Sequence, residues 1–356
     1  MKFILCEPES RKTWDVFGIL RRDYPSAKIF ILCRNSIEKK ITSVFYLRTI
    51  PIVADDLQKS SDETLFYTAY AIPIEDWFID LLQSIPEKMR PRLACLDQAN
   101  LTICRNKKSL YGHLNAVGIR APKVYSELEV ASLPPGTPLV LKPMVGSGSR
   151  GLEFVSAQAG SQMGPNAVQD RFFCERIGKS NQVEGVFILA SHGQLVASYV
   201  HRRLLTWPKS AGVSVLSEII EAPDLEAFAR EVVAATSFHG LGMIETLSDD
   251  HNQPCLIEIN TRIWGSFLLS QSLETSLLTN YIYVCNNVEF TTTTRKNYYK
   301  FLFPHRAILS AGGLIHLLKS IVSKQYLVSG FYHVPFFRSL LFPFISTIRY
   351  FSRYAK

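Results

Sequence analysis

Two apolar segments in the middle of the chain are separated by a lysine and by a loop of glycine and serine. Residues 139–142 read Leu-Val-Leu-Lys, residues 146–151 read Gly-Ser-Gly-Ser-Arg-Gly, and residues 152–155 read Leu-Glu-Phe-Val. Glycine allows the dihedral angles and the close approach with which backbone N–H groups surround phosphate oxygens. Residues 152–155 have the alternation of a strand. The segment therefore predicts a strand, a loop that can bind phosphate, and a second strand.

Several kinds of loop fit parts of this pattern. Gly146, Gly148 and Gly151 have the G-x-G-x-x-G spacing of a dinucleotide-binding turn, but that turn needs a helix after it. A P-loop ends in Gly-Lys-Ser or Gly-Lys-Thr, which this loop lacks. A protein kinase has its lysine downstream of the loop, whereas Lys142 lies upstream. A plain glycine-serine hairpin stays open as the alternative to a nucleotide loop.

A second polar pattern follows an apolar run near residue 260. Glu258, Asn260 and Arg262 are each two residues apart, so on a strand they point to one face. Residues 240–247 predict another strand that carries Glu245, which taken alone is better explained as a solvated strand residue. Carboxylate and amide oxygens suit a hard cation such as Mg²⁺, and arginine can hold phosphate with two N–H groups. Together these residues predict a platform for Mg²⁺ and a triphosphate.

In this order the motifs resemble those of the ATP-grasp superfamily of carboxylate–amine (or carboxylate–thiol) ligases, from about residue 106 to about residue 272. The resemblance implies that ATP is bound with Mg²⁺ or Mn²⁺. It implies a cofactor-binding set of Lys107, Lys142, Gly146, Ser147, Gly148, Ser149, Gly151, Glu175, Arg176, Ile177 and Glu184. It also implies that Glu245, Glu258 and Asn260 are the metal ligands and that Arg262 is a catalytic, phosphate-side arginine.

Details of the implied site stay open at this point. The hinge residues 174–178 are expected to face the adenine, where either the Glu175 side chain or the backbone alone accepts from the amino group. Glu184 lies where the family places an acidic ribose contact. Arg202 and Arg203 lie in a His-Arg-Arg stretch that resembles one in uncharacterised members of the family. They are candidates for holding a substrate carboxylate or an acyl-phosphate, and a basic exposed hairpin is the alternative. No general base is assigned to His201.

The expected fold is α/β (α+β): an ATP-grasp fold with a Rossmann-like N-terminal domain and a basic, aromatic-rich helical extension. The chain has 356 residues, enough for two or three domains. The expected boundaries are 1–100, 101–174, 175–289 and 290–356. Strands at 2–6 and 27–33 flank a helix at 14–22, and a helix at 224–237 precedes the strand of Glu245. Seven scattered cysteines and a short apolar N-terminus favour a reduced, cytoplasmic protein.

The last 67 residues carry the net charge of the chain. Residues 290–356 contain ten Lys or Arg, no Asp or Glu, and fifteen Phe or Tyr, whereas the other residues carry 29 basic and 31 acidic side chains. Basic and aromatic side chains together suit an anionic membrane surface. No recognition motif supports nucleic acid. The alternative, slightly favoured here, is that these residues form helices that pack on the protein core.

The resemblance implies a function as an ATP-dependent ligase. It would activate a carboxylate as an acyl-phosphate and join it to an amine, with small-molecule substrates of an amino-acid-like kind. The alternatives are an enzyme of the bicarbonate-activating carboxylase or carbamoyl-phosphate type, and a non-catalytic ATP-binding protein associated with a membrane. Homodimers are common in the family, so a homodimer is a further expectation.

Overall fold

The computed structural model describes residues 1–46, 48–54, 68–146, 151–164, 168–178, 183–207, 213–272, 277–288, 300–302, 307, 311–322 and 326–328. The chain divides into two compact units. The first unit comprises Met1–Cys95, Val215–Ile219 and Arg262–Lys356, and the second comprises Leu96–Ser214 and Ile220–Thr261. The four-part division stays a prediction.

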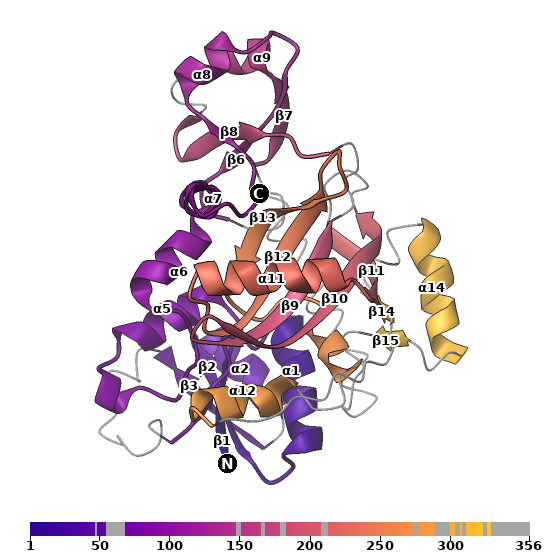
Figure 1. Ribbon diagram of the computed structural model, residues 1–356. Helices are drawn as coiled ribbons and strands as arrows, with labels where there is room; N and C mark the ends of the chain where they lie inside the picture. The colour runs from indigo at the N-terminus through magenta and orange to yellow at the C-terminus, as the bar shows by residue number, and fades with distance from the viewer. Residues whose placement is uncertain are drawn as a thin grey trace. The chain divides into compact units, whose positions relative to one another are not determined.

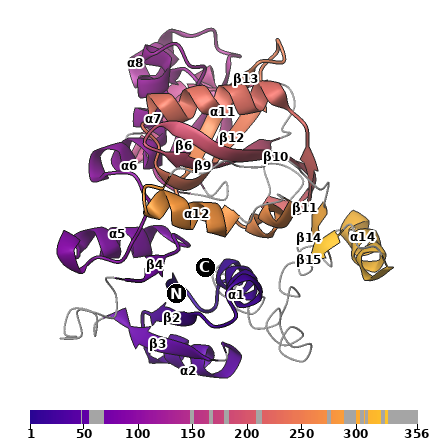
Figure 2. The same ribbon diagram turned by 60° about the horizontal axis from the view of Figure 1, so that its bottom comes forward.

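The first unit contains a small parallel sheet with the strand order β3-β2-β1-β4. Its strands are β1 (Lys2–Cys6), β2 (Lys28–Cys33), β3 (Thr49–Val53) and β4 (Tyr70–Ala71). Helix α1 (Arg11–Asp23) joins β1 to β2, and α2 (Ser36–Phe45) joins β2 to β3; Figure 2 shows α2 beside β2 and β3. The β-α-β order predicted for this region is confirmed.

The remaining elements of the first unit directly follow β4 or come from the C-terminal part of the chain. They are α5 (Asp76–Ser84), η1 (Glu87–Met89), η2 (Phe267–Ser272), α12 (Leu277–Cys285), β14 (Lys300–Leu302), α14 (Ala311–Val322) and β15 (Tyr326–Val328). Strand β14 pairs antiparallel with β11 (Val213–Ile220) and parallel with β15. The tail, expected to be helical, therefore also contributes two short strands. Among the described residues no helix is long and apolar enough to cross a membrane.

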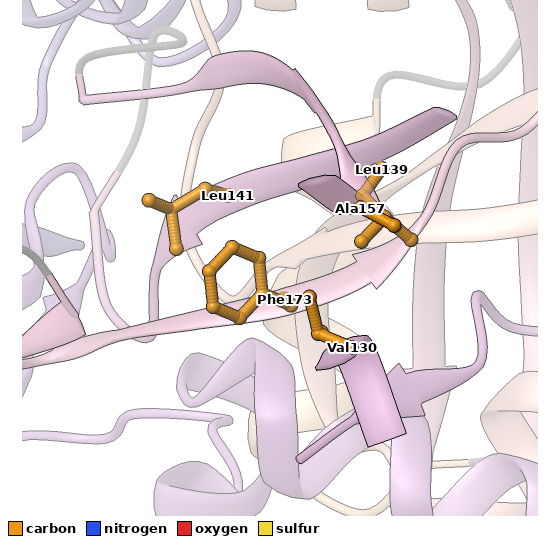
Figure 3. Close-up of a cluster of buried hydrophobic side chains, with 5 residues drawn as sticks. All are labelled: Val130, Leu139, Leu141, Ala157 and Phe173. Atoms are coloured by element: carbon orange, nitrogen blue, oxygen red, sulfur yellow. The ribbon is translucent and has the colours of Figure 1, made fainter. Parts of the chain in front are cut away.

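The smaller sheet of the second unit has the order β5-β8-β6-β7 and is antiparallel. Its strands are β5 (Val124–Tyr125), β6 (Pro138–Pro143), β7 (Glu153–Ser156) and β8 (Arg171–Glu175), with α8 (Glu127–Ser132) and α9 (Ala157–Ser161) beside them. A buried cluster of Val130, Leu139, Leu141, Ala157 and Phe173 fixes these helices on the sheet (Figure 3). Strands β6 and β7 form the predicted strand–loop–strand, so the dinucleotide-binding turn is excluded.

The larger sheet of the second unit has the antiparallel order β13-β12-β9-β10. Its strands are β9 (Glu184–Ser191), β10 (Gln194–Trp207), β12 (Gly240–Ser248) and β13 (Pro254–Asn260). Helix α11 (Pro223–Ala235) runs across this sheet (Figure 1) and buries an apolar stripe that includes Phe228 and Val232. The helix predicted at 224–237 is thereby confirmed. Two further helices, α6 (Gln98–Arg105) and α7 (Lys107–Ala116), precede the small sheet.

Candidate nucleotide and metal site

The start of α7 is fixed against the beginning of the glycine-serine loop. The side chain of Asn106 caps the helix by accepting from the Ser109 N–H. Lys107 donates its backbone N–H to Met144 O at 2.8 Å and its Nζ to Gly146 O at 2.5 Å. Gly146 has φ of +143°, a backbone conformation that suits glycine. The helix thus places the first predicted lysine directly beside the loop.

The second predicted lysine lies on β6 and is buried. Nζ of Lys142 donates to the hydroxyl of Tyr111 and lies over the ring of Tyr111, 4.7 Å from its centroid. No carboxylate of the described residues forms a salt bridge with it. Burial lowers the pKa of Lys142; Cys174 and Glu258 act in the opposite direction, and Lys107 lowers the pKa further. This lysine is a buried cation that could bind an anionic ligand.

Two predicted metal ligands lie opposite each other on neighbouring strands. Glu245 on β12 is the register partner of Glu258 on β13, and Asn260 follows two residues later on the same face. Carboxylates in such a pair repel each other. Here Nζ of Lys107 lies 3.7 Å from Oε2 of Glu258, and Nη2 of Arg203 lies 2.6 Å from Oε1 of Glu245. The structure therefore brings two metal candidates together with a lysine and an arginine of the predicted site.

The donor atoms of this set fit Mg²⁺. The predicted ligands are oxygen donors, which hard cations prefer, and Mg²⁺ is commonly held by one or two carboxylates together with phosphate oxygens. In the part of the chain that the structure describes, no group of three or more His, Cys, Asp or Glu side chains could hold a metal. The opposed pair Glu245 and Glu258 would thus need Asn260 and phosphate oxygens to complete a coordination shell.

The row of Glu245 and Glu258 continues across two more strands. Gly185 on β9 is the register partner of both Glu245 and His201 on β10. A Cβ on Gly185 would lie 2.9 Å from Cδ2 and Nε2 of His201, so the imidazole occupies the space that a side chain at 185 would need. Burial, and then Arg203, lowers the pKa of His201 to about 3. His201 is therefore neutral at physiological pH.

The two candidate substrate arginines lie on opposite faces of the sheet. Successive residues of β10 alternate in direction, so Arg203 points to the side of His201 and Arg202 to the other. Arg202 is the register partner of Glu184 on β9. Burial raises the pKa of Glu184, and Arg202 acts in the opposite direction. Arg203 thus joins the carboxylate row, whereas Arg202 accompanies the candidate ribose residue.

The Glu175 carboxylate is already bound within the second unit. Nη1 and Nη2 of Arg120 donate to its two oxygens at 2.9 and 2.6 Å, and the Lys123 N–H donates to Oε2 at 3.1 Å. Burial raises the pKa of Glu175, but these hydrogen bonds outweigh it and leave the pKa lowered. No role was predicted from the sequence for Arg120, which stands in a Gly-Ile-Arg-Ala-Pro stretch at residues 118–122.

The hinge that follows requires a glycine. Gly178 has φ of +59°, and a Cβ there would lie 2.4 Å from Ser248 O. The guanidinium of Arg176 lies 4.9 Å from the ring centroid of Phe154, and Ile177 is buried. The close approach to Ser248 explains the residue type at 178, a position that the sequence prediction placed in the hinge without a reason.

The other predicted residues are placed as follows. Arg262 belongs to the first unit, where Nε lies 2.8 Å from Oδ2 of Asp76 and 3.8 Å from Oε2 of Glu75. Gly151 has φ of +71° and closes the loop next to Pro143. Ser147, Gly148 and Ser149 lie outside the described residues.

Comparison with known proteins decides the family of this domain. The sequence profile of the ATP-grasp domain matches residues 104–266. The chain contains an ATP-grasp domain. This domain spans the two lysines, the hinge and the carboxylate row, so the predicted resemblance and fold are confirmed. No curated protein sequence matches the chain.

Solved structures share the fold at low sequence identity. One is the biotin carboxylase domain of Hydrogenobacter thermophilus 2-oxoglutarate carboxylase, solved in complex with MgADP, ADP and bicarbonate. Its TM-score is 0.65 and its sequence identity is 12%, and the match covers 84% of this chain and 73% of that one. Thermotoga maritima N5-carboxyaminoimidazole ribonucleotide synthetase has a TM-score of 0.57 at 13% identity, covering 84% and 79%. Rhizobium etli pyruvate carboxylase has 0.61 at 14%, covering 81% of this chain but only 28% of its own length.

Proposed function

We propose that this protein is an ATP-dependent ligase that activates a carboxylate as an acyl-phosphate and joins it to an amine. The observation that carries the proposal is the cluster in the ATP-grasp domain: the opposed carboxylates Glu245 and Glu258, with Lys107 and Lys142. Lysines and a hard cation together are what a triphosphate needs. The domain match and the fold of the neighbouring structures support this assignment.

Each side chain has a definite task in this proposal. Lys107 and Lys142 bind the phosphates, and the hinge backbone at Arg176 and Ile177 contacts the adenine, because the Glu175 carboxylate is bound to Arg120. Glu245, Glu258 and Asn260 would hold Mg²⁺, for which Mn²⁺ is an alternative. When bound, the cation neutralises charge on the phosphates. Glu184 contacts the ribose.

The reaction needs positioning more than covalent chemistry. An oxygen of the substrate carboxylate attacks the γ-phosphorus of ATP, the bond to the ADP oxygen breaks, and ADP leaves. The amine nitrogen then attacks the acyl carbon, phosphate leaves, and the amine loses its proton to solvent. Arg203, which pairs with Glu245, would stabilise the transferred phosphoryl group. His201 does not serve as the base, because its pKa of about 3 makes it too weak an acceptor near neutral pH.

A second candidate function is the activation of bicarbonate. The 2-oxoglutarate carboxylase domain is solved with bicarbonate, and the other two similar structures named above are a carboxylase and a carboxyaminoimidazole ribonucleotide synthetase. Bicarbonate would take the place of the carboxylate and become carboxyphosphate. The cluster of Lys142 and Glu258 serves both chemistries equally, because both pass through transfer of the γ-phosphoryl group.

The deciding experiment measures ADP release. The full chain with Mg²⁺ and ATP is screened against amino acids as paired carboxylate and amine, and against bicarbonate with an amine. ADP that forms only with an organic carboxylate and an amine supports the ligase, and ADP that requires bicarbonate supports the second function. Tight binding of ATP without ADP from any pair would instead favour a non-catalytic binding protein.

The carboxylate row is tested by Glu258→Ala, with Glu221→Ala, outside the cluster, as the control. We expect Glu258→Ala to lower the rate of ADP formation by at least about 100-fold, because a direct metal ligand is lost. The control should retain the rate of the original chain. Full activity in Glu258→Ala would contradict the site.

A further inference from the structure

A buried tyrosine connects the two strands that carry the site. Tyr111 lies on α7, one helical turn after Lys107, and its side chain is fully buried. Its hydroxyl donates to Ile257 O on β13 at 2.6 Å and accepts from Nζ of Lys142 on β6. We propose that Tyr111 is a positioning residue that aims the ammonium group of Lys142 at the phosphates of the nucleotide. The inference rests on the proposed function.

The direction of both hydrogen bonds follows from the chemistry of the groups. A carbonyl oxygen only accepts and an ammonium group only donates, so the single hydroxyl proton of Tyr111 goes to Ile257 O. The oxygen lone pairs then face Lys142. One N–H of Lys142 is thereby fixed, and its other two stay available for an anion. Ile257 directly precedes Glu258. The two hydrogen bonds of the Tyr111 hydroxyl, called the relay below, therefore connect Lys142 to the strand that carries a predicted metal ligand.

The charge balance at Lys142 points to an anionic ligand. The groups in direct contact with its Nζ are a neutral hydroxyl and the rings of Tyr111 and Phe172, whose centroids lie 4.7 and 6.0 Å away. Glu258, Cys174 and Lys107 act on it electrostatically without a salt bridge. Burial raises the pKa of Tyr111 well above its usual value, so the phenol stays neutral and supplies no counter-charge. Lys107, in contrast, has Glu258 at 3.7 Å. Nucleotide phosphate would bring the counter-charge that Lys142 lacks.

The hydroxyl and the ring of Tyr111 can be tested separately. Phenylalanine fills the same volume and retains the contact between ring and ammonium, so Tyr111→Phe removes only the relay. Because the hydroxyl accepts a hydrogen bond from the charged amine, its loss should lower the pKa of Lys142 further. The ammonium group of Lys142 would then be held less firmly in one position, and it would lose its proton at a lower pH.

The experiment is calorimetric titration of the full chain with Mg²⁺–ATP and with adenosine, from about pH 6.5 to about pH 9.5. The variants are Tyr111→Phe, Lys142→Met and Tyr46→Phe. Tyr46 is the matched control, because its buried hydroxyl also donates to a backbone carbonyl, Pro8 O at 2.5 Å, but in the first unit.

We expect Tyr111→Phe to weaken Mg²⁺–ATP binding by about tenfold, as for the loss of a hydrogen bond to a charged group. The pH above which affinity falls should move lower, adenosine should bind within about twofold of the original chain, and Tyr46→Phe should change neither ligand. Unchanged ATP affinity and pH dependence in Tyr111→Phe would overturn the inference, as would an equal loss of adenosine. If Lys142→Met retained full ATP affinity, the proposed nucleotide site itself would fail.

Discussion

A partly buried charge cluster in the first unit and the buried Lys142 in the second differ in how their cations are balanced. In the first unit, Nζ of Lys12 lies 2.5 Å from Oε1 of Glu75, and Nε of Arg262 lies 2.8 Å from Oδ2 of Asp76. In the second unit, the described surroundings of Lys142 contain no salt-bridge partner. A balanced cluster is complete within the protein, whereas an unbalanced buried cation is costly until an anion binds. The difference favours a structural role for the first cluster and supports the proposal that Lys142 binds an anionic ligand.

The comparison bears directly on Arg262. The family resemblance predicts that this arginine binds phosphate, but its guanidinium is held by Asp76 and lies near Glu75. To serve as a phosphate ligand, Arg262 would share its remaining N–H groups or leave these carboxylates. Its catalytic role stays a prediction.

The largest expected effect comes from replacing the two lysines by methionine. Lys142→Met should weaken Mg²⁺–ATP binding by at least about 100-fold, because a buried charge–phosphate contact is lost, and should leave the free energy of unfolding unchanged within about 1 kcal/mol. Lys12→Met should leave nucleotide affinity unchanged but lower the free energy of unfolding by about 1 kcal/mol, since Glu75 loses its nearer partner and, among the described residues, keeps only Arg262 at 3.8 Å. Calorimetry and urea unfolding measure the two quantities. Equal effects of both variants on either quantity would remove the distinction.

A smaller effect concerns His201, a group in the second unit that stays uncharged. Its pKa is about 3 in the folded protein and about 6.5 when unfolded, so below about pH 6.5 the unfolded chain binds the extra proton. The free energy of unfolding must then fall as the pH drops. Between pH 7 and pH 5 this group accounts for about 2 kcal/mol of the loss. His201→Gln should reduce that pH dependence in urea unfolding, whereas an unchanged slope would show that His201 is not buried as described.

The smallest expected effect concerns the tail. Helix α14 leaves Ile315 and Leu318 56% and 60% exposed, three residues apart on one face, within the basic segment 290–356. The expectation that the tail contacts an anionic membrane can be tested on this face, because it is the exposed apolar surface that would meet lipid. The double variant Ile315→Glu with Leu318→Glu, in the full chain, should lower sedimentation with phosphatidylserine vesicles by about tenfold in partition coefficient. Equal sedimentation of both proteins would favour the alternative that the tail serves the core.

Much of the local structure follows from the sequence. The two strands on either side of the glycine-serine loop and the common face of Glu258 and Asn260 could be predicted because strand periodicity places polar residues on known faces. The register that sets Glu245 opposite Glu258 could not be predicted in this way. Tyr111 and Arg120 could not, since a tyrosine four residues after a lysine in a helix is as well explained by ordinary core packing. Their partners, Ile257 and Glu175, are 146 and 55 residues away along the chain. These contacts can be recognised only in the folded structure.

The positions of Arg202 and Arg203 are a second case in which the sequence did not predict the spatial arrangement. Both were predicted to hold substrate because they lie in the His-Arg-Arg stretch that resembles one in the family, yet adjacent residues of a strand point to opposite faces. The partners are Glu184 for Arg202 and Glu245 for Arg203. Strand alternation would have predicted this separation. It could not be applied to the sequence, because the sequence did not predict that residues 201–207 belong to a strand.

Gly185 gives the carboxylate row its asymmetry. Two strands of the row, β13 and β12, present carboxylates, and the fourth, β10, presents the neutral imidazole of His201, which lies in the space above the glycine. Any residue other than glycine at 185 would place its Cβ where the imidazole of His201 now lies, so the imidazole would have to move. The absence of a side chain at 185 is thus what allows a buried imidazole to lie next to the strand that carries Glu245.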